Sequence, residues 1–400
     1  MIKVAILGYG TVGSGVVEVL TTNAGIIAKR AGQEVGVKYV LDLRDFPGDP
    51  IQSKVVHDFQ IILDDPEVDI VVETMGGTKP AYEFVKKALL AGKSVCTSNK
   101  ELVAAYGAEL VHLAKSKSVN FLFEASVGGG IPVIRPLNQS LTADKILKIN
   151  GILNGTTNYI LTKMAKEGSD FDVVLKEAQE LGYAEKDPTA DVEGYDACRK
   201  IAILTSLAYG KQVNYEEVYT EGITKITAED FKYAEKLEAA IKIFGSSRKE
   251  GGKLYAMVAP QMIRRDNPLF AVEGVFNAIC VTGNMLGDVM FYGKGAGKEA
   301  TASAVVSDVV DAVKHMNINV MTIWEDEKMI VEPMEEMENR FFVRIGKEEK
   351  EKVEKLFDEP EFVDAGLEGE IGFVTEKITE GRFAEALKEL STVIDRKSVV

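Results

Sequence analysis

Hydrophobic and polar positions alternate in blocks along residues 1–130, and the blocks predict strands followed by helices. Strands are expected at residues 2–7, 35–43, 70–74, 94–97 and 121–125. Continuous apolar runs of this kind are typical of a parallel sheet that is buried on both faces. Helices are expected between the strands, for example over residues 80–91. The pattern therefore predicts a doubly wound α/β sheet.

A glycine-rich turn follows the first expected strand. Gly8, Gly10 and Gly13 have the spacing Gly-x-Gly-x-x-Gly, and an apolar helix begins just after them. Glycines at these places allow a tight turn and let a pyrophosphate approach the helix N-terminus. Because the turn directly follows an N-terminal strand, it predicts a dinucleotide-binding domain of the Rossmann type.

The end of the second expected strand carries conflicting signals for the coenzyme. Asp42 or Asp45 would bind the ribose hydroxyls of NAD, whereas Arg44 would hold the 2′-phosphate of NADP. The sequence leaves this choice open.

Three further positions, Thr74, Gly76 and Lys100, follow the carboxyl ends of later strands. Ligands of doubly wound sheets bind beyond these ends, so the three positions predict the coenzyme crevice. The alternative for Lys100 is a solvated lysine that opens the next helix, and its strand-end position favours the functional interpretation.

Residues 124–132 read Glu-Ala-Ser-Val-Gly-Gly-Gly-Ile-Pro. Three consecutive glycines leave carbonyl oxygens accessible, and together with the Glu124 carboxylate they would surround a monovalent cation. A flexible hinge between domains fits the same residues equally well.

The pattern changes from residue 146 onward. Residues 148–161 predict a strand, a polar Asn-Gly turn and a helix. Further helices are expected at 171–181, 230–244 and 300–315, and further strands at 253–259 and 277–283. We therefore expect an α+β domain with one sheet and its helices on one face. A second glycine loop at 293–297 precedes the helix over 300–315, which is expected to pack back on the first domain.

The last 80 residues predict a separate ferredoxin-like βαββαβ domain. Its strands are expected at 341–345, 361–365, 372–377 and 392–400, and its helices at 350–357 and 383–390. The expected domains are residues 1–134 with 297–318 for the dinucleotide, 135–296 for catalysis and dimerisation, and 319–400 as an accessory or regulatory domain.

Composition narrows the function classes. The chain of 400 residues has a net charge of -15, which argues against nucleic acid or an anionic membrane as a partner. The 3 cysteines and 3 histidines are scattered, which excludes a disulfide framework, a zinc site and a histidine triad. The N-terminal residues predict a strand that leads into a glycine loop, not a signal peptide. No apolar run reaches membrane-spanning length. We therefore expect a cytoplasmic protein.

The stretch from Gly182 to Lys200 concentrates acids on a short loop that glycine and proline interrupt. The acids are Glu185, Asp187, Asp191, Glu193 and Asp196. Asp196 and Lys200 are four residues apart at the start of a helix, so they share one face of it. Such a pair is most often solvated. The acid loop before it suits a cationic ligand group, and a lysine beside an aspartate suits proton transfer.

With these motifs in place, residues 1 to about 316 resemble the homoserine dehydrogenases. The resemblance lies in Gly-x-Gly-Thr-Val-Gly at 8–13, Thr-Ser-Asn-Lys at 97–100, Glu-Ala-Ser-Val-Gly-Gly-Gly-Ile-Pro at 124–132, Asn-Gly-Thr-Thr-Asn-Tyr-Ile-Leu at 154–161, the block from 182 to 200, and Gly-x-Gly-Ala-Gly at 293–297. Ser98 and Cys198 stand where alanine is common in the family. The C-terminal segment resembles a regulatory ACT domain without its Pro-Gly turn.

The resemblance implies the reversible, NAD(P)-dependent reduction of L-aspartate 4-semialdehyde to L-homoserine, a step in threonine, methionine and isoleucine biosynthesis. Lys200 is implied as the proton donor, Asp196 as the residue that orients it, and Lys100 as a neighbour of nicotinamide and substrate. An ammonium at Lys200 would stabilise the negative charge that grows on the aldehyde oxygen and would supply the proton.

The resemblance also implies the binding residues. Glu185 and Asp191 would hold the amino-acid end of the substrate. From the residues alone, the polar turn of Asn154, Gly155 and Thr156 would reach the substrate, or it is a turn that binds no ligand. By resemblance the coenzyme would contact Gly10, Thr11, Val12, Thr74 and Gly297, with Lys100 near the nicotinamide. The other expected coenzyme positions are Gly8, Gly13, Arg44, Gly76 and Ser98. Na⁺ or K⁺ would be bound by Glu124 and the backbone of Val127, Gly129 and Ile131. A homodimer through the sheet of the second domain, or a higher homo-oligomer, is expected.

Two alternative functions would each require different residues. Another amino-acid or semialdehyde dehydrogenase of this fold would need a catalytic cysteine, and neither Cys96 nor Cys198 lies in a sequence setting that favours a thiolate. A nucleotide-sensing regulator without catalysis would leave Asp196 and Lys200 without a role.

Overall fold

The computed structural model describes residues 1–399, and the chain forms two compact units. The first unit comprises Met1–Lys145, Ala202–Tyr215 and Phe291–Met329. The second comprises Ile146–Ile201, Glu216–Met290 and the chain from Ile330 onward. The finer division into three domains stays a prediction.

The first unit is built on a six-stranded parallel sheet in the order β3-β2-β1-β4-β5-β6. Its strands are β1 (Ile2–Leu7), β2 (Val35–Leu41), β3 (Val55–Val56), β4 (Ile70–Glu73), β5 (Ser94–Thr97) and β6 (Phe121–Leu122). The direction of winding reverses between β1 and β4, where doubly wound sheets bind their ligands. The predicted Rossmann sheet is confirmed, although β2 ends at Leu41 and β6 at Leu122 rather than at residues 43 and 125.

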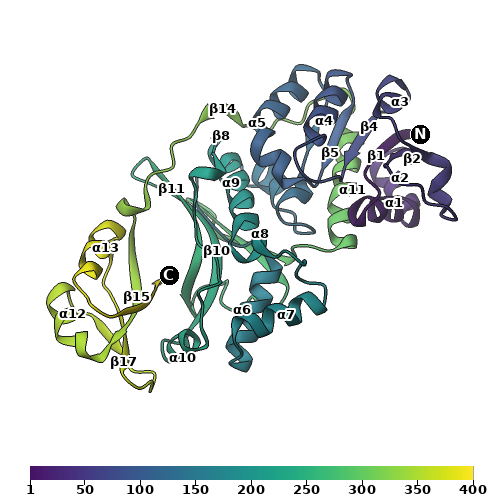
Figure 1. Cartoon of the computed structure of the whole chain (residues 1–400). Coiled ribbons are helices and arrows are strands. Elements are labelled where there is room, and N and C mark those ends of the chain that lie inside the picture. Colours follow the sequence, from purple (N-terminus) through teal and green to yellow (C-terminus); the bar gives the residue numbers. More distant parts are fainter. Residues whose placement is uncertain (400) are drawn as a thin grey trace. The chain divides into compact units, whose positions relative to one another are not determined.

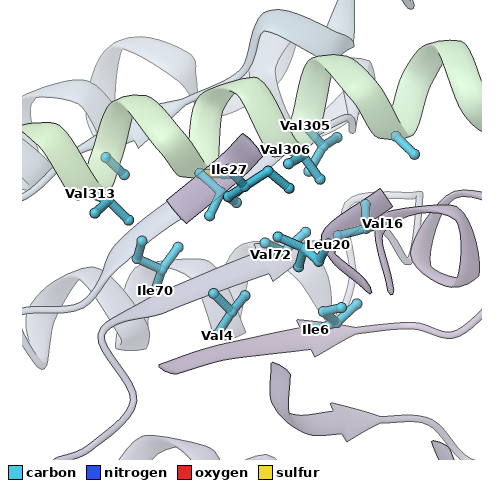
Figure 2. Close-up of a cluster of buried hydrophobic side chains, with 14 of the residues drawn as sticks. Val4, Ile6, Val16, Leu20, Ile27, Ile70, Val72, Val305, Val306 and Val313 are labelled. Carbon is cyan, nitrogen blue, oxygen red and sulfur yellow. The ribbon is translucent and has the colours of Figure 1, made fainter. Parts of the chain in front are cut away.

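Helices α1 (Thr11–Thr22), α2 (Ala24–Ala31) and α11 (Lys298–Lys314) pack together on this sheet. Figure 2 shows valines of α11 facing Val4, Ile6, Ile70 and Val72 of the central strands β1 and β4. The approach of α1 to α11 is close, because a Cβ at Gly15 would lie 3.0 Å from the Cβ of Ala302. The other helices of this unit are α3 (Phe59–Asp64), α4 (Ala81–Leu90) and α5 (Lys100–Ser116), and α4 packs on β4, β5 and α5.

The second unit contains a mixed sheet with the path β13-β12-β7-β10-β11-β19-β15-β17-β16. Its first part consists of β7 (Ile146–Ile152), β10 (Ala239–Glu250), β11 (Lys253–Arg264), β12 (Phe276–Gly283) and β13 (Gly287–Lys294). Helix α6 (Gly155–Glu167) packs on β10 and β12 and against α7 (Phe171–Glu180). Figure 1 shows β10 and β11 as a long hairpin.

One predicted helix is wrong over half its length. Residues 230–244 were expected to be helical, but α10 spans Ala228–Lys236 and residues from Ala239 belong to β10. Glu238 has a φ of 49°, in the left-handed region that ends a helix. Strand β10 then pairs with β11 along its whole length, from Ala239 opposite Arg264 to Glu250 opposite Lys253. Long-range pairing in the hairpin thus outweighs the local preference for helix.

The C-terminal residues form the predicted βαββαβ arrangement. Its elements are β15 (Glu338–Gly346), α12 (Lys350–Leu356), β16 (Glu361–Val363), β17 (Glu370–Val374), α13 (Glu380–Lys388) and β19 (Val393–Val399). The strand order β19-β15-β17-β16 is antiparallel throughout. Strand β19 also pairs in parallel with β11, through Gln261 opposite Ser398 and Met262 opposite Val399. The segment that the sequence marks as separate therefore extends the sheet of the second unit, and Val400 of the last predicted strand lies outside the described residues.

The other α-helices and strands are one long helix and five short elements. They are α8 (Thr189–Val192), α9 (Tyr195–Tyr209), β8 (Lys211–Gln212), β9 (Tyr219–Thr220), β14 (Glu325–Lys328) and β18 (Ile378–Thr379). No single helix in residues 1–399 is long and apolar enough to cross a membrane; α1 and α2 together would reach the length, but they are bent by 81°.

Buried charges join the C-terminal strands to α10. Arg344 on β15 donates to Asp230 Oδ1 at 2.7 Å and to Glu370 Oε2 at 2.8 Å. Lys397 Nζ lies 3.2 Å from Asp230 Oδ2. The side chains of Arg344, Asp230 and Lys397 are 5%, 0% and 2% exposed, so solvent contributes little to satisfying these charges. Burial lowers the pKa of Lys397, against the opposing charge of Asp230.

We predict that Arg344→Met lowers the free energy of unfolding by about 3–5 kcal/mol, because it leaves Asp230 and Glu370 without their common partner. Arg340→Met on the same strand is the control, since Arg340 pairs with Glu361 at 3.4 Å in a partly exposed position and donates one hydrogen bond to the Thr375 carbonyl at 3.0 Å. Its loss should lower the free energy by about 1–2 kcal/mol, which is less than the loss of Arg344. Urea unfolding followed by circular dichroism measures both. Equal effects of the two substitutions would contradict the buried role of Arg344.

Candidate active site

The turn between β7 and α6 is the base of the site in the second unit. Asn154 caps α6, and its Oδ1 accepts a hydrogen bond from the backbone N–H of Thr157 at 2.9 Å. Gly155 follows because a Cβ at this position would lie 2.7 Å from the carbonyl oxygen of Val275. The capping bond and the close packing therefore account for Asn154 and Gly155 in this turn.

Four predicted site residues meet at this turn. The Asn154 Nδ2 group donates to Asp191 Oδ1 at 2.7 Å and to Asp196 Oδ2 at 2.9 Å. Lys200 Nζ donates to the same oxygen of Asp196 at 2.7 Å and to the carbonyl of Leu153 at 2.9 Å. Asp196 and Lys200 are 2% and 8% exposed. The pair is therefore buried, which excludes the solvated surface pair that is the usual meaning of its spacing.

The acid loop before α9 is more exposed. The backbone carbonyl of Glu185 accepts a hydrogen bond from Gln179 at 3.0 Å. Thr156 Oγ1 donates to the carbonyl of Tyr183 at 2.6 Å, which ties this loop to the first turn of α6. The predicted substrate residues Thr156, Glu185 and Asp191 thus belong to connected parts of one unit.

The glycine loop of the first unit has the geometry that a diphosphate needs. Gly8 has a φ of +93°, and a Cβ at Gly13 would lie 1.9 Å from the carbonyl oxygen of Gly8. A Cβ at Gly10 would meet no heavy atom within 4 Å, so the backbone is open there, just before Thr11 and Val12 begin α1. Thr74 Oγ1 donates to the Gly8 carbonyl at 3.0 Å and braces the loop. This open, helix-terminal loop fits a dinucleotide.

The end of β2 is tied to the glycine loop. Asp42 Oδ2 accepts from the backbone N–H of Tyr9 at 2.8 Å and from Arg44 Nη2 at 2.9 Å. Its Oδ1 accepts from the backbone N–H and the Nε of Arg44, at 3.0 Å and 2.9 Å. The hydrogen bond from Arg44 holds the pKa of Asp42 well below its usual range, although burial opposes this. The side chain of Arg44 itself is 62% exposed.

Sequence reasoning missed a buried acid, Glu73, at the end of β4. Its carboxylate accepts hydrogen bonds from Thr97 Oγ1 at 2.6 Å and from the backbone N–H groups of Met75 and Gly76 at 2.7 Å and 3.3 Å. Burial raises the pKa of Glu73, against these hydrogen bonds. An acid at the end of the otherwise apolar run Ile-Val-Val-Glu was a visible signal of such a role.

Asn99 was also missed. It caps α5 by accepting from the backbone N–H of Leu102 at 3.1 Å, and it donates to the carbonyl of Gly77 at 2.6 Å. Ser98 and Lys100, two predicted coenzyme residues, flank this cap, and Lys100 is the first residue of α5. Asparagine before a helical lysine is a capping signal that the sequence contained.

Glu124 is buried and organises the loop that follows it. Its Oε1 accepts from the backbone N–H groups of Val133 and Ile134 at 2.6 Å and 2.8 Å, and its Oε2 from Arg135 at 2.7 Å. A carboxylate has about four acceptor sites, so these bonds leave about one for another partner. The contacts of Glu124 are thus mainly with its own chain.

The glycines after Glu124 approach the second glycine loop. A Cβ at Gly129 would lie 2.3 Å from the carbonyl oxygen of Gly295, and the N–H of Gly130 donates to the Lys294 carbonyl at 3.2 Å. Gly297, with a φ of +116°, then caps α11. Val127 and Ile131 are buried in the same loop. Within residues 1–399 no group of three or more His, Cys, Asp or Glu could hold a metal, so a cation here would depend on carbonyl oxygens, and this site stays a prediction.

Asp308 on α11 holds the start of this loop. Its Oδ2 accepts from the backbone N–H of Glu124 at 2.8 Å, and its Oδ1 from Arg135 Nη2 at 2.5 Å. Burial raises the pKa of Asp308 to about 8, while the charge of Arg135 opposes the shift. A helix from late in the chain thereby fixes a loop from the first third of it.

The three cysteines are buried free thiols, and burial raises the pKa of each of them. A raised pKa keeps a thiol protonated and unreactive. The dehydrogenase chemistry that would require a catalytic cysteine therefore has no support in the described residues.

The parallel sheet and the open glycine loop are those of a dinucleotide-binding protein. Similarity to known proteins gives the class, an NAD(P)-dependent oxidoreductase that acts on a CH–OH group.

Comparisons with known proteins identify the family. A model of the homoserine dehydrogenase family matches residues 132–310, and a model of the NAD-binding domain of homoserine dehydrogenase matches residues 8–124. The homoserine dehydrogenase of Bacillus subtilis (strain 168) is 44% identical over 326 residues, which are 80% of this chain and 74% of that protein. The chain belongs to the homoserine dehydrogenase family, whose reaction interconverts L-aspartate 4-semialdehyde and L-homoserine in threonine and methionine biosynthesis.

Solved structures agree with this assignment. The homoserine dehydrogenase of Thiobacillus denitrificans is 36% identical, with a TM-score of 0.91 over 100% of this chain and 98% of that one. A hyperthermophilic archaeal homoserine dehydrogenase in complex with NADPH is 32% identical, with a TM-score of 0.67 over 78% of this chain and 97% of that one.

We predict that Glu124→Gln lowers the free energy of unfolding by about 2–3 kcal/mol, because the amide presents an N–H group to a backbone N–H and loses charge-assisted bonds. Glu109→Gln is the control, since Glu109 is partly exposed beside Lys86 and its change should alter the free energy by less than about 1 kcal/mol. Urea unfolding of both variants is the measurement. A Glu124→Gln protein as stable as the control would show that the backbone bonds do not hold the loop.

Proposed function

We propose that Lys200 is the proton donor of the homoserine dehydrogenase reaction and that Asp196 orients it. The observation that supports this is the buried ion pair itself, in which Lys200 Nζ lies 2.7 Å from Asp196 Oδ2. A buried lysine and aspartate need a specific set of partners, and such pairs are frequent where a proton is transferred. The bound nicotinamide coenzyme supplies the hydride.

The role of Lys200 follows from where charge develops. As the aldehyde carbon is reduced, negative charge grows on its oxygen, and an ammonium beside that oxygen stabilises the charge and then protonates it. Asp196 and the Leu153 carbonyl fix two directions of the ammonium. In the reverse reaction the neutral amine accepts the proton of the homoserine hydroxyl.

We propose that the substrate is bound by the residues around this pair. Glu185 and Asp191 would hold its ammonium group, because they lie on the acid loop and on α8 beside it. Gly155 and Thr156, at the start of α6, would contact its polar end. Lys100 would complete the catalytic set from the start of α5.

The geometry at β2 favours NADP over NAD. Arg44 and the N–H of Tyr9 occupy the acceptor sites of Asp42, so Asp42 is poorly placed to accept from a ribose hydroxyl. The guanidinium of Arg44 donates to Asp42 through Nε and Nη2, and the exposed remainder of this group would contact a 2′-phosphate. The archaeal relative in complex with NADPH is consistent with this preference. The other proposed coenzyme contacts are Gly8, Gly10, Thr11, Val12, Gly13, Thr74, Gly76, Ser98 and Gly297.

Two further proposals concern binding and assembly. A monovalent cation, Na⁺ or K⁺, would be held by Glu124 and the carbonyls of Val127, Gly129 and Ile131, with Glu124 contributing at most about one acceptor site. A homodimer would form through the sheet of the second unit, where β13 is an edge strand. The C-terminal βαββαβ elements would serve regulation.

A spectrophotometric assay tests the proposal. The purified protein, mixed with homoserine, should reduce NADP, and NAD more weakly, with a rise in absorbance from the reduced nicotinamide. No reduction of either coenzyme would refute the proposed function.

We predict that the rate of homoserine oxidation rises with pH, because the reaction needs Lys200 in its neutral form to accept the proton of the hydroxyl. Initial rates at saturating substrate between pH ~7 and ~10 measure this. A flat profile over this range would count against Lys200 as the group that exchanges the proton.

We predict that Lys200→Ala lowers kcat by about 10²–10⁴-fold and raises KM much less, because the lost interaction acts in the transition state. Lys163→Ala is the matched control, since Lys163 on α6 pairs with Glu167 and Glu177 at the surface and should leave both constants unchanged. A large rise in KM with an unchanged kcat would reassign Lys200 to substrate binding.

A further inference from the structure

We infer that Asn154 is a positioning residue for the reaction: its side-chain amide holds Asp191 and Asp196 together and thereby fixes the direction of the Lys200 ammonium. This role differs from the substrate contact that the sequence suggests for Asn154. The inference deepens the proposed function and rests on it.

The orientation of the Asn154 amide is set by its own helix. Its Oδ1 accepts from the backbone N–H of Thr157 at 2.9 Å and lies 3.0 Å from Thr157 Oγ1. A backbone N–H can only donate, so this side of the amide must be the oxygen. The Nδ2 group is therefore turned away from α6.

Both hydrogens of this Nδ2 group have an acceptor. One bond leads to Asp191 Oδ1 on α8, at 2.7 Å, and the other to Asp196 Oδ2 on α9, at 2.9 Å. An NH₂ group is planar, with its two N–H bonds at a fixed angle, so the two carboxylates are held in one arrangement. The amide joins the end of β7 to two elements that come much later in the chain.

The same oxygen of Asp196, Oδ2, accepts hydrogen bonds from both Asn154 Nδ2 and Lys200 Nζ. The amide is one constraint on the rotation of this carboxylate, because it donates to the oxygen that faces the ammonium. Asp196 Oδ2 and the Leu153 carbonyl both accept from Lys200 Nζ and help to fix its position.

The charges around Asn154 explain why a neutral side chain suits this position. The charged groups around Asn154 include Asp191 from α8 and Asp196 and Lys200 from α9. The turn after β7 contributes the uncharged Leu153 carbonyl, and α6 contributes Thr157. A neutral donor shared by two carboxylates reduces their repulsion without adding a charge beside the ammonium. An acid in its place would add a third negative charge.

Two substitutions separate positioning from mere helix capping. Asn154→Asp keeps the shape and the acceptor for Thr157, but it replaces the donor with a negative charge. We expect kcat for homoserine oxidation to fall at least about tenfold, and the pH at which the rate rises to move upward by about one unit, since added negative charge favours the ammonium. Asn154→Ser keeps an N-capping oxygen and loses the bridge, so kcat should fall without the upward shift.

Thr379→Ala is the matched control. Thr379 caps α13 by accepting from the backbone N–H of Arg382, and it has no part in the site. We expect it to lower the midpoint of thermal unfolding while kcat, KM and the pH profile stay unchanged.

The outcomes distinguish the inference from the function on which it rests. If the unsubstituted protein oxidises homoserine but both Asn154 variants keep its kcat and its pH profile, Asn154 is only a helix cap and the inference is wrong. If the unsubstituted protein oxidises no homoserine with either coenzyme, the proposed function fails instead. Should Asn154→Asp unfold, Asn154→Ser alone decides, since an unchanged kcat there overturns the bridging role.

Discussion

The second unit depends on the burial of one ammonium and one carboxylate, Lys200 and Asp196, on the same face of α9. A buried charge without partners would be too unfavourable to keep, so the chain around the pair is constrained to supply them. Leu153 gives a carbonyl and Asn154 an amide from the turn after β7. Gly194, with a φ of +83°, lets the chain turn from α8 into α9 so that Asp191 and Asp196 both face this turn.

The first unit uses carboxylates in a different way, as acceptors for backbone N–H groups of irregular segments. Asp42 binds the N–H of Tyr9 in the glycine loop, Glu73 binds those of Met75 and Gly76, and Glu124 binds three in the turn after it. Glycine-rich loops have few side chains with which to hold themselves. An acid beside each loop replaces them and holds the backbone in one shape.

Buried charges also hold the C-terminal strands, where they stabilise the fold. Arg344 and Lys397 bind the fully buried Asp230, and β19 continues the sheet from β11. Hydrogen bonds along a shared sheet and a buried ion cluster make this segment part of the second unit.

The sequence by itself determined the strand-loop-helix order of the Rossmann sheet, the βαββαβ order of the tail and the family motifs, because apolar periodicity, glycine spacing and short motifs are local properties. It failed at residues 230–244, where pairing of β10 with β11 outweighed local helix preference. It also gave no sign that β19 joins β11, that Glu124 binds its own backbone, or that Asn154 bridges two acids. Only the tertiary structure decided these, because each depends on burial and on partners far away in the sequence, and neither is written in the residues next to the group concerned.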